Sequence, residues 1–349
     1  MRILWLWFWI GFAIAFLFLP RCAHGSVTVA AYGAKGDGFT DDAPAFQQAL
    51  SSGQEVRVAR GTYALRTTLN IEPGMTLIGE NNPTLLVGPQ PTFVVSSSYD
   101  WVTIQGFTIN CQGQGANVFT FEPGTYEVRI NNCVLINGHS AFVQAGGAVG
   151  AIYCTGDLMA QMSGASWDFA AGAGSGLYIE GCTVIPNLPS IPSVYAIGYG
   201  GIYIKGFDQY EYPNVPKNGG WAFEFYNCYS IYIDRVVLDG LNTGGFLFSN
   251  CFNINGTGIV SWGCYGSGLE AIVSQRGSFS GCAFNYSQSS GVILDGCQML
   301  AFTGTELIGN SGFGALMTGG SSSNTFSGSA AQYNAFGGVY ADSEGNTIQ

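Results

Sequence analysis

Charged residues are scarce in this sequence. Only 9% of its 349 residues are charged, and 22 acidic residues against 11 basic ones give a net charge of −11. Lys and Arg form no cluster along the chain. A phosphate-rich partner would be repelled, so the composition argues against a protein that binds nucleic acid.

Patterns that bind metals are missing as well. The sequence has 2 His, of which only His139 lies beyond residue 25, and it has no CxxC pair and no extended cluster of aspartates. Zinc sites are built from such Cys and His groups, and calcium sites from gathered carboxylates. We therefore expect no metal and no other cofactor.

Long apolar runs are absent except at the N-terminus. There Arg2 precedes an apolar run from Ile3 to Leu19, and the small-residue pattern Ala23-His24-Gly25 follows. This is typical of a secretory signal peptide over residues 1–25, with a membrane anchor as the alternative because about 17 to 25 apolar residues span a bilayer. We expect residues 26–349 to be secreted or periplasmic, or on the cell surface if the segment is retained.

Glycine, in contrast, is abundant, with 52 residues, and it is spaced regularly. A period of 23 residues predicts a solenoid, and the first and third residues after each glycine are mostly apolar, as in Phe246 and Phe248. Such pairs indicate short strands with one inward face, and helical solenoids tolerate little glycine. A β-helix is therefore predicted, with one frame that runs back through Ala222, Gly201 and Gly176. The glycines of the period are Gly245, Gly268, Gly291, Gly314 and Gly337.

Four cysteines follow the same frame. Cys182, Cys228, Cys251 and Cys297 each lie six positions after the residue that opens a coil, which predicts one column. Such a column is either a row of small buried apolar side chains or the site of a Cys228–Cys251 disulfide, because neighbouring coils are about 4.8 Å apart.

Three segments near the N-terminus carry a family resemblance: residues 27–50, 59–63 and 75–80. They resemble the opening of rhamnogalacturonase/epimerase-type domains of the pectate-lyase-like superfamily, which includes polygalacturonases, lyases, epimerases and phage tailspikes. The resemblance implies an all-β, right-handed parallel β-helix with coils of about 23 residues, as a single domain over residues 26–349. It says little about the reaction.

The same segment predicts an N-terminal cap over residues 26–60. Residues 35–38 are typical of a tight turn, and Thr40, Asp41 and Asp42 are typical of the start of a helix that would run to about Leu50. We expect this short helix to cover the first coil.

The active-site pattern of polygalacturonases is not present. That family has an Asn-Thr-Asp stretch, then a pair of aspartates, then Gly-His-Gly, one coil apart. The matching places here are Asn-Thr-Gly-Gly at 242–245, Ser-Gly at 267–268 and Ser-Gly at 290–291. The resemblance therefore implies the fold and not that active site.

Candidate site residues come from the outward positions of the coils, which are the second and fourth after each opening residue. Aromatic and acidic residues are predicted to share one face there. Glu224 and Glu270 are two coils apart, roughly 9.6 Å, and inverting glycosidases hold their carboxyls about 6.5 to 9.5 Å apart. We predict them as an acid/base pair, against the alternative of solvated surface carboxylates. The predicted substrate-binding residues, with Tyr rings as platforms, are Tyr178, Glu180, Tyr203, Lys205, Tyr226 and Asp295.

The sequence leaves three functions open. The first is a glycoside hydrolase acting on a polysaccharide, including an acidic, pectin-like one. The second is a lyase or uronate epimerase, for which Lys205 beside Glu180, Arg235 or Arg276 would supply the positive charge. The third is a non-catalytic glycan-binding or surface protein. Residues 186–192 and 208–218 are expected to be loops beside the groove.

The C-terminal coil has no predicted cap. The coil that opens at Gly337 is followed by only 12 residues, none of them typical of a covering helix. We expect that the gene product continues or that this end is buried in a homo-oligomer.

Overall fold

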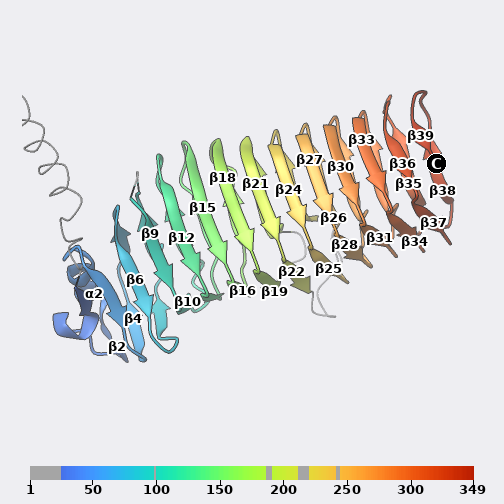
Figure 1. Ribbon diagram of the computed structural model, residues 1–349. Helices are drawn as coiled ribbons and strands as arrows, with labels where there is room; N and C mark the ends of the chain where they lie inside the picture. The colour runs from blue at the N-terminus through green and yellow to red at the C-terminus, as the bar shows by residue number, and fades with distance from the viewer. Residues whose placement is uncertain (1–24, 98–99, 186–190, 211–219, 241–243) are drawn as a thin grey trace, which may run out of the picture.

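The computed structural model describes residues 25–97, 100–185, 191–210, 220–240 and 244–349. The chain winds through three parallel sheets in turn, so that each coil adds one strand to each sheet and neighbouring coils lie side by side (Figure 1). We name the sheets A, B and C. None of the helices in these ranges is long and apolar enough to cross a membrane.

Sheet A has 14 strands, and they lie in front in Figure 1. They are β1 (Ser26–Thr28), β3 (Glu55–Val58), β6 (Thr76–Gly79), β9 (Val102–Gln105), β12 (Tyr126–Asn131), β15 (Val149–Thr155), β18 (Gly174–Glu180), β21 (Tyr199–Lys205), β24 (Tyr229–Asp234), β27 (Phe252–Thr257), β30 (Gln275–Ser280), β33 (Gln298–Thr303), β36 (Thr325–Ser327) and β39 (Thr347–Ile348).

Sheet B has 13 strands and follows sheet A in each coil. They are β2 (Asp37–Asp41), β4 (Thr62–Leu65), β7 (Thr84–Val87), β10 (Thr108–Asn110), β13 (Val134–Ile136), β16 (Leu158–Ala160), β19 (Thr183–Ile185), β22 (Asp208–Tyr210), β25 (Val237–Asp239), β28 (Val260–Trp262), β31 (Ala283–Asn285), β34 (Glu306–Ile308) and β37 (Ala330–Gln332).

Sheet C has 12 strands and completes the coil. They are β5 (Leu69–Ile71), β8 (Phe93–Val95), β11 (Phe119–Phe121), β14 (Phe142–Gln144), β17 (Trp167–Phe169), β20 (Val194–Ile197), β23 (Trp221–Tyr226), β26 (Gly244–Ser249), β29 (Leu269–Ile272), β32 (Val292–Asp295), β35 (Phe313–Thr318) and β38 (Gly337–Ala341).

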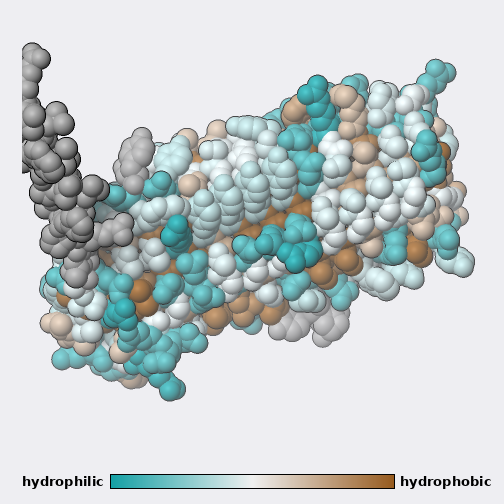
Figure 2. All heavy atoms as spheres, viewed as in Figure 1, coloured by the Kyte–Doolittle hydropathy of each residue, from teal (hydrophilic) through white to brown (hydrophobic). Residues whose placement is uncertain are grey.

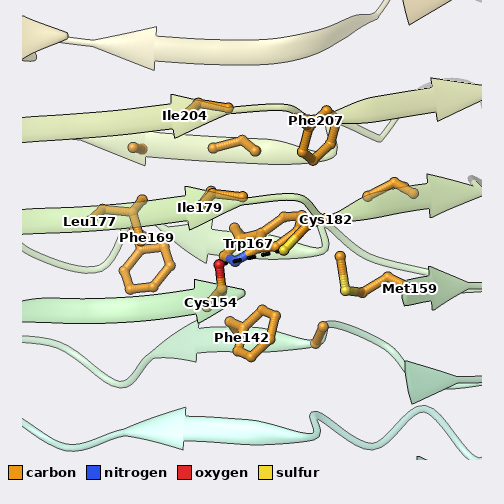
Figure 3. Close-up of a cluster of buried hydrophobic side chains, with 14 of the residues drawn as sticks. Phe142, Cys154, Met159, Trp167, Phe169, Leu177, Ile179, Cys182, Ile204 and Phe207 are labelled. Atoms are coloured by element: carbon orange, nitrogen blue, oxygen red, sulfur yellow. Dashed lines mark hydrogen bonds between the residues drawn. The ribbon is translucent and has the colours of Figure 1, made fainter. Parts of the chain in front are cut away.

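The core is a set of apolar columns that run along the solenoid. Equivalent inward residues of successive coils stack on one another, so Phe93, Phe119, Phe142 and Trp167 form a continuous row with ring centroids 5.0 to 5.4 Å apart. Figure 3 shows part of this core, where side chains of sheets A and C meet. The predicted inward pair Phe246 and Phe248 is fully buried in it. Burial of these columns supplies the hydrophobic stabilisation of the fold.

The frame of 23 residues holds only for part of the chain. Phe223 pairs with Phe246 at a step of 23, but Trp167 pairs with Val194 and Val194 with Phe223, at steps of 27 and 29. Counting back by about 23 therefore leaves sheet C, and the pairs after Gly176 and Gly201 belong to strands β18 and β21 of sheet A. The single frame predicted from the sequence is wrong before residue 222. At the C-terminal end Ala315 pairs with Val339, so the last coil is also displaced by one residue from the expected Gly337.

The predicted cysteine column is likewise two columns. Cys228, Cys251 and Cys297 lie at the corners where sheet C leads into sheet A, whereas Cys182 lies where sheet A leads into sheet B. Cys228 and Cys251 are buried free thiols, and their Sγ atoms donate to the carbonyls of Ala196 and Phe225 one coil back. The structure therefore has the row of small buried side chains and no disulfide between these two residues.

The predicted capping helix is present as α2 (Ala43–Leu50), next to a short 3-10 helix, η1 (Val29–Tyr32). Phe46 of α2 is fully buried and packs edge-on against Tyr63 of the first coils, with ring centroids 5.3 Å apart. Asp42 is the N-cap residue, but its carboxylate accepts from the amides of Lys35 and Gly36 instead of capping the helix. It thereby ties the turn at residues 35–38 to the helix.

Candidate functional site

The predicted site residues lie on two faces of the solenoid. Glu224, Tyr226, Glu270 and Asp295 are on strands of sheet C. Tyr178, Glu180, Tyr203 and Lys205 are on β18 and β21 of sheet A. The prediction of one shared face is wrong, because the two longer coils displace the frame.

An outward column of acids runs along sheet C. In register order it contains Asp168, Tyr195, Glu224, Leu247 and Glu270. Glu224 and Glu270 are thus two coils apart with Leu247 between them, as predicted, at a backbone separation of roughly 9.6 Å. Leu247 is only 7% exposed although it points outward. The two carboxyls therefore flank an apolar floor.

The two glutamates have different surroundings. Partial burial raises the pKa of Glu224, and the hydroxyl of Tyr226, 3.3 Å from its Oε2, opposes that rise. Partial burial also raises the pKa of Glu270, and the negative charge of Asp295 in the next coil raises it further. Glu270 therefore holds a proton more readily than Glu224. Tyr226 in turn has a pKa raised to about 12 by burial and by Glu224, so it stays a hydrogen-bond donor.

The structure adds two residues that the sequence frame missed. Asp168 and Tyr195 continue the column toward the N-terminus, and partial burial raises the pKa of both. Asp168 stands two coils before Glu224, the same interval that separates Glu224 from Glu270. A signal existed in the aromatic residues that flank Asp168, since Trp-Asp-Phe has the alternation of a strand with an outward acid.

One histidine lies beside this column. His139 Nδ1 and Ser163 Oγ are 3.1 Å apart, in equivalent positions of successive coils just before sheet C. The His139 ring also lowers the pKa of Asp168 against the larger effect of burial. Among the described residues no three His, Cys, Asp or Glu side chains converge in a way that would hold a metal ion.

The tyrosines of sheet A form a ladder. Tyr153, Tyr178, Tyr203 and Tyr232 stack face to face, with ring centroids 4.3, 4.8 and 5.0 Å apart and planes within 6°. Both ring faces of Tyr178 and Tyr203 are therefore covered by neighbouring rings. These residues present edges and hydroxyls to solvent, so they cannot serve as flat platforms for a sugar.

Lys205 and Glu180 form an ion pair beside the ladder, with Nζ and Oε1 2.8 Å apart and both side chains about half exposed. The pair was expected to be adjacent, and it is. Of the two expected loops, residues 208–210 form strand β22, whereas residues 211–219 and 186–190 lie outside the described residues, as does the expected signal peptide over residues 1–24.

Known proteins share parts of this chain. Residues 26–115 match a family model described as rhamnogalacturonase A/epimerase, pectate lyase-like. The pre-neck appendage protein of Bacillus phage B103 is 30% identical over 103 residues, a match that covers 26% of this chain and 12% of that protein. The chain thus matches a small part of the phage protein's length.

Two solved structures share the architecture. The catalytic unit of the GH87 alpha-1,3-glucanase of Streptomyces thermodiastaticus has a TM-score of 0.52 at 12% identity, covering 93% of this chain and 68% of that one. The A-module of mannuronan C-5 epimerase AlgE4 of Azotobacter vinelandii has a TM-score of 0.50 at 12% identity, covering 93% of this chain and 100% of that one. At such identities the likeness shows the fold: a right-handed parallel β-helix of the pectate-lyase-like type.

Proposed function

We propose that this β-helix is a polysaccharide hydrolase whose acid/base pair is Glu270 and Glu224 on sheet C. The observation that carries the proposal is the register of these two partly buried carboxyls, two coils apart, with pKa values raised by burial. Their separation suits an inverting mechanism, in which a water molecule must fit between the base and the sugar.

The surroundings of the two groups suggest their roles. Glu270, whose pKa is raised by burial and by Asp295, would protonate the oxygen of the glycosidic bond. Glu224, whose carboxylate accepts the hydrogen bond from Tyr226, would take a proton from the attacking water. The bond between C1 and the leaving oxygen breaks as water adds to C1, and both carboxyls exchange their protons with solvent afterwards.

The charge of sheet C favours hydrolysis over elimination or epimerisation. Those reactions need a positive group to neutralise the uronate carboxyl, and the 12 described strands of sheet C contain no Lys, Arg or His. Their outward side chains do include Asp168, Glu224, Glu270 and Asp295. We therefore favour a substrate without carboxylates, in contrast to the pectin-like polymer that the sequence alone allowed.

The comparisons support this proposal in part. A glucanase and an epimerase are both built on the same fold, and the N-terminal match includes a phage appendage protein. We propose an extracellular or surface location on that basis. Oligomerisation through the C-terminal coil remains a proposal, supported by the partial exposure of its inward residues Val339 and Ala341.

The deciding experiment compares Glu270→Gln and Glu224→Gln with the parent on a panel of neutral and acidic polysaccharides. Release of reducing ends should fall by roughly 10² to 10⁴ in each variant, while the unfolding free energy changes by no more than about 0.5 kcal/mol. Asp239→Gln on sheet B is the exposed acidic control and should keep full activity. Glutamine variants that retain the parent's rate would refute the assignment. New absorbance from an unsaturated uronate would identify a lyase instead.

The non-catalytic alternative predicts a different result. A binder would release no reducing ends from any polymer in the panel, yet would still be retarded by one of them in an affinity gel. In that case the same glutamine variants would weaken binding without any loss of turnover, because there would be none to lose.

A further inference from the structure

A second concave surface lies on sheet A, on a different face from the acidic column. It encloses about 480 Å³ and is lined by Tyr126, Ala151, Ser175, Gly176, Tyr178, Gly200, Gly201, Tyr203, Tyr229 and Ser230. Figure 2 views the solenoid with sheet A in front and shows side chains of intermediate hydropathy in regular rows over the middle coils. We name this surface the sheet A groove.

The groove lies between two outward columns. The first column contains, in register order, Tyr126, Gly150, Ser175, Gly200 and Tyr229. The second column is the tyrosine ladder. One residue in each strand between the columns has a left-handed backbone, such as Ala151 at φ 51° and Gly201 at φ 62°. Such a residue bends the strand, and the bend separates the columns so that a hollow opens between them.

Two tyrosines of the first column close the ends of the groove. Tyr126 and Tyr229 are four coils apart, about 19 Å at ~4.8 Å per coil. Their rings lie over Gly150 and Gly200 respectively, because a Cβ added at either glycine would overlap the neighbouring ring. Glycine at these positions is therefore what lets both rings lean toward Ser175 at the centre. Tyr126 and Tyr229 are 37% and 52% exposed.

The lining has a chemistry that suits an uncharged sugar. All ten lining residues are Tyr, Ser, Gly or Ala, so none contributes a charge at neutral pH. The only ion pair nearby, Lys205 with Glu180, neutralises itself at the far end of the strands. Aromatic rings with hydroxyl tips combine an apolar surface with hydrogen-bonding groups, as sugar hydroxyls and C–H faces require.

We propose that the sheet A groove is a second glycan-binding site that takes a short stretch of an uncharged polysaccharide, with Tyr126 and Tyr229 as its aromatic contacts. The site is separate from the acid/base pair on sheet C, so it would retain a polymer while another stretch is cleaved. Two sites on one rigid solenoid raise the effective concentration of the chain at the second site.

The test is affinity electrophoresis in gels that contain hydroxyethyl cellulose, dextran or xyloglucan, with polygalacturonate as the anionic comparison. At least one neutral polymer should retard the parent protein more than polygalacturonate does. Tyr126→Ala combined with Tyr229→Ala should raise the dissociation constant about tenfold or more. The matching double Phe variant keeps the rings and should bind nearly as the parent does.

Two controls separate this site from the proposed active site. Tyr333→Ala removes a tyrosine that is 86% exposed outside the groove and should change nothing. Glu224→Gln combined with Glu270→Gln should abolish hydrolysis and leave retardation by the sheet A groove in place. Loss of hydrolysis and loss of retardation therefore report on the two proposals independently.

Three results would overturn the inference. The double Ala variant could be retarded as strongly as the parent by every polymer. The parent could be retarded by none of the neutral polymers. Sedimentation could show that the double Ala variant dissociates an oligomer, in which case the occupant of the groove is a second copy of the chain.

Discussion

Replacing Asp157 by Asn should stabilise the protein at neutral pH. Asp157 lies at the corner between β15 and β16, is 1% exposed, and has Cys133 and Cys182 as its neighbours in the adjacent coils. Its Oδ1 accepts the amide of Cys133 at 2.8 Å, but its Oδ2 is buried without a hydrogen-bond partner. Burial raises the pKa of this carboxyl well above its usual range.

The sign of the pH effect follows from that rise. An acid whose pKa is higher in the folded state binds more protons there, so the unfolding free energy falls as pH increases above the pKa of about 3.9 in the unfolded chain. The loss is about 1.4 kcal/mol per pH unit until the folded group itself ionises, with a ceiling of about 4 kcal/mol at pH 7. Stability from this group is therefore complete only in acid.

Asparagine keeps the acceptor for Cys133 and cannot ionise. Its buried amide hydrogens without a partner cost about 1 to 3 kcal/mol, the same kind of penalty that the acid already incurs. We expect Asp157→Asn to gain about 1 to 3 kcal/mol at pH 7 and to gain nothing, or lose slightly, near pH 4.

The assay is urea unfolding followed by tryptophan fluorescence, at intervals from about pH 4 to about pH 8, with the slope of unfolding free energy against pH as the readout. Asp100→Asn, at an exposed acid, is the matched control and should leave that slope unchanged. A variant at position 157 with the parent's pH slope, or one less stable than the parent at every pH, would show that the buried carboxyl is not the source.

Three further predictions concern the corners, the ladder and the active site. Cys228→Ser should change the unfolding free energy by less than about 1 kcal/mol in urea titrations, because Ser274 occupies an equivalent corner with its hydroxyl bonded to the carbonyl of Phe248 and the amide of Cys251; a loss above about 3 kcal/mol would contradict this. Tyr153→Ala should cost about 1 to 3 kcal/mol from two lost ring contacts while kcat and KM for hydrolysis stay at the parent's values, and a raised KM would place the ladder in the active site after all. Asp295→Asn should lower the pKa of Glu270 by removing a negative charge, so the alkaline limb of the pH–rate profile moves to lower pH and the acid limb, which reports Glu224, stays in place; an unchanged alkaline limb would argue against Glu270 as the acid.

Part of the candidate site could be predicted from the sequence. The positions of Glu224 and Glu270 lie within the region where coils have 23 residues, so their register and outward direction followed from alternation along a strand. Asp168 and Tyr195 lie beyond the coils of 27 and 29 residues, where no constant period could be counted. The sequence also gives no direct sign of ring orientation. Tyr178 and Tyr203 were therefore expected to be platforms, although stacking covers their faces.

The sequence by itself determined the type of fold, because short apolar alternation at a fixed period, together with abundant glycine, can bury its strands only in stacked coils. It also determined the capping helix and the inward columns, which depend on neighbouring residues alone. Only the tertiary structure decided which sheet each outward residue belongs to, since that depends on how much chain each connection uses before the next strand pairs. The division of the predicted site into an acidic column on sheet C and an aromatic groove on sheet A is a consequence of those lengths.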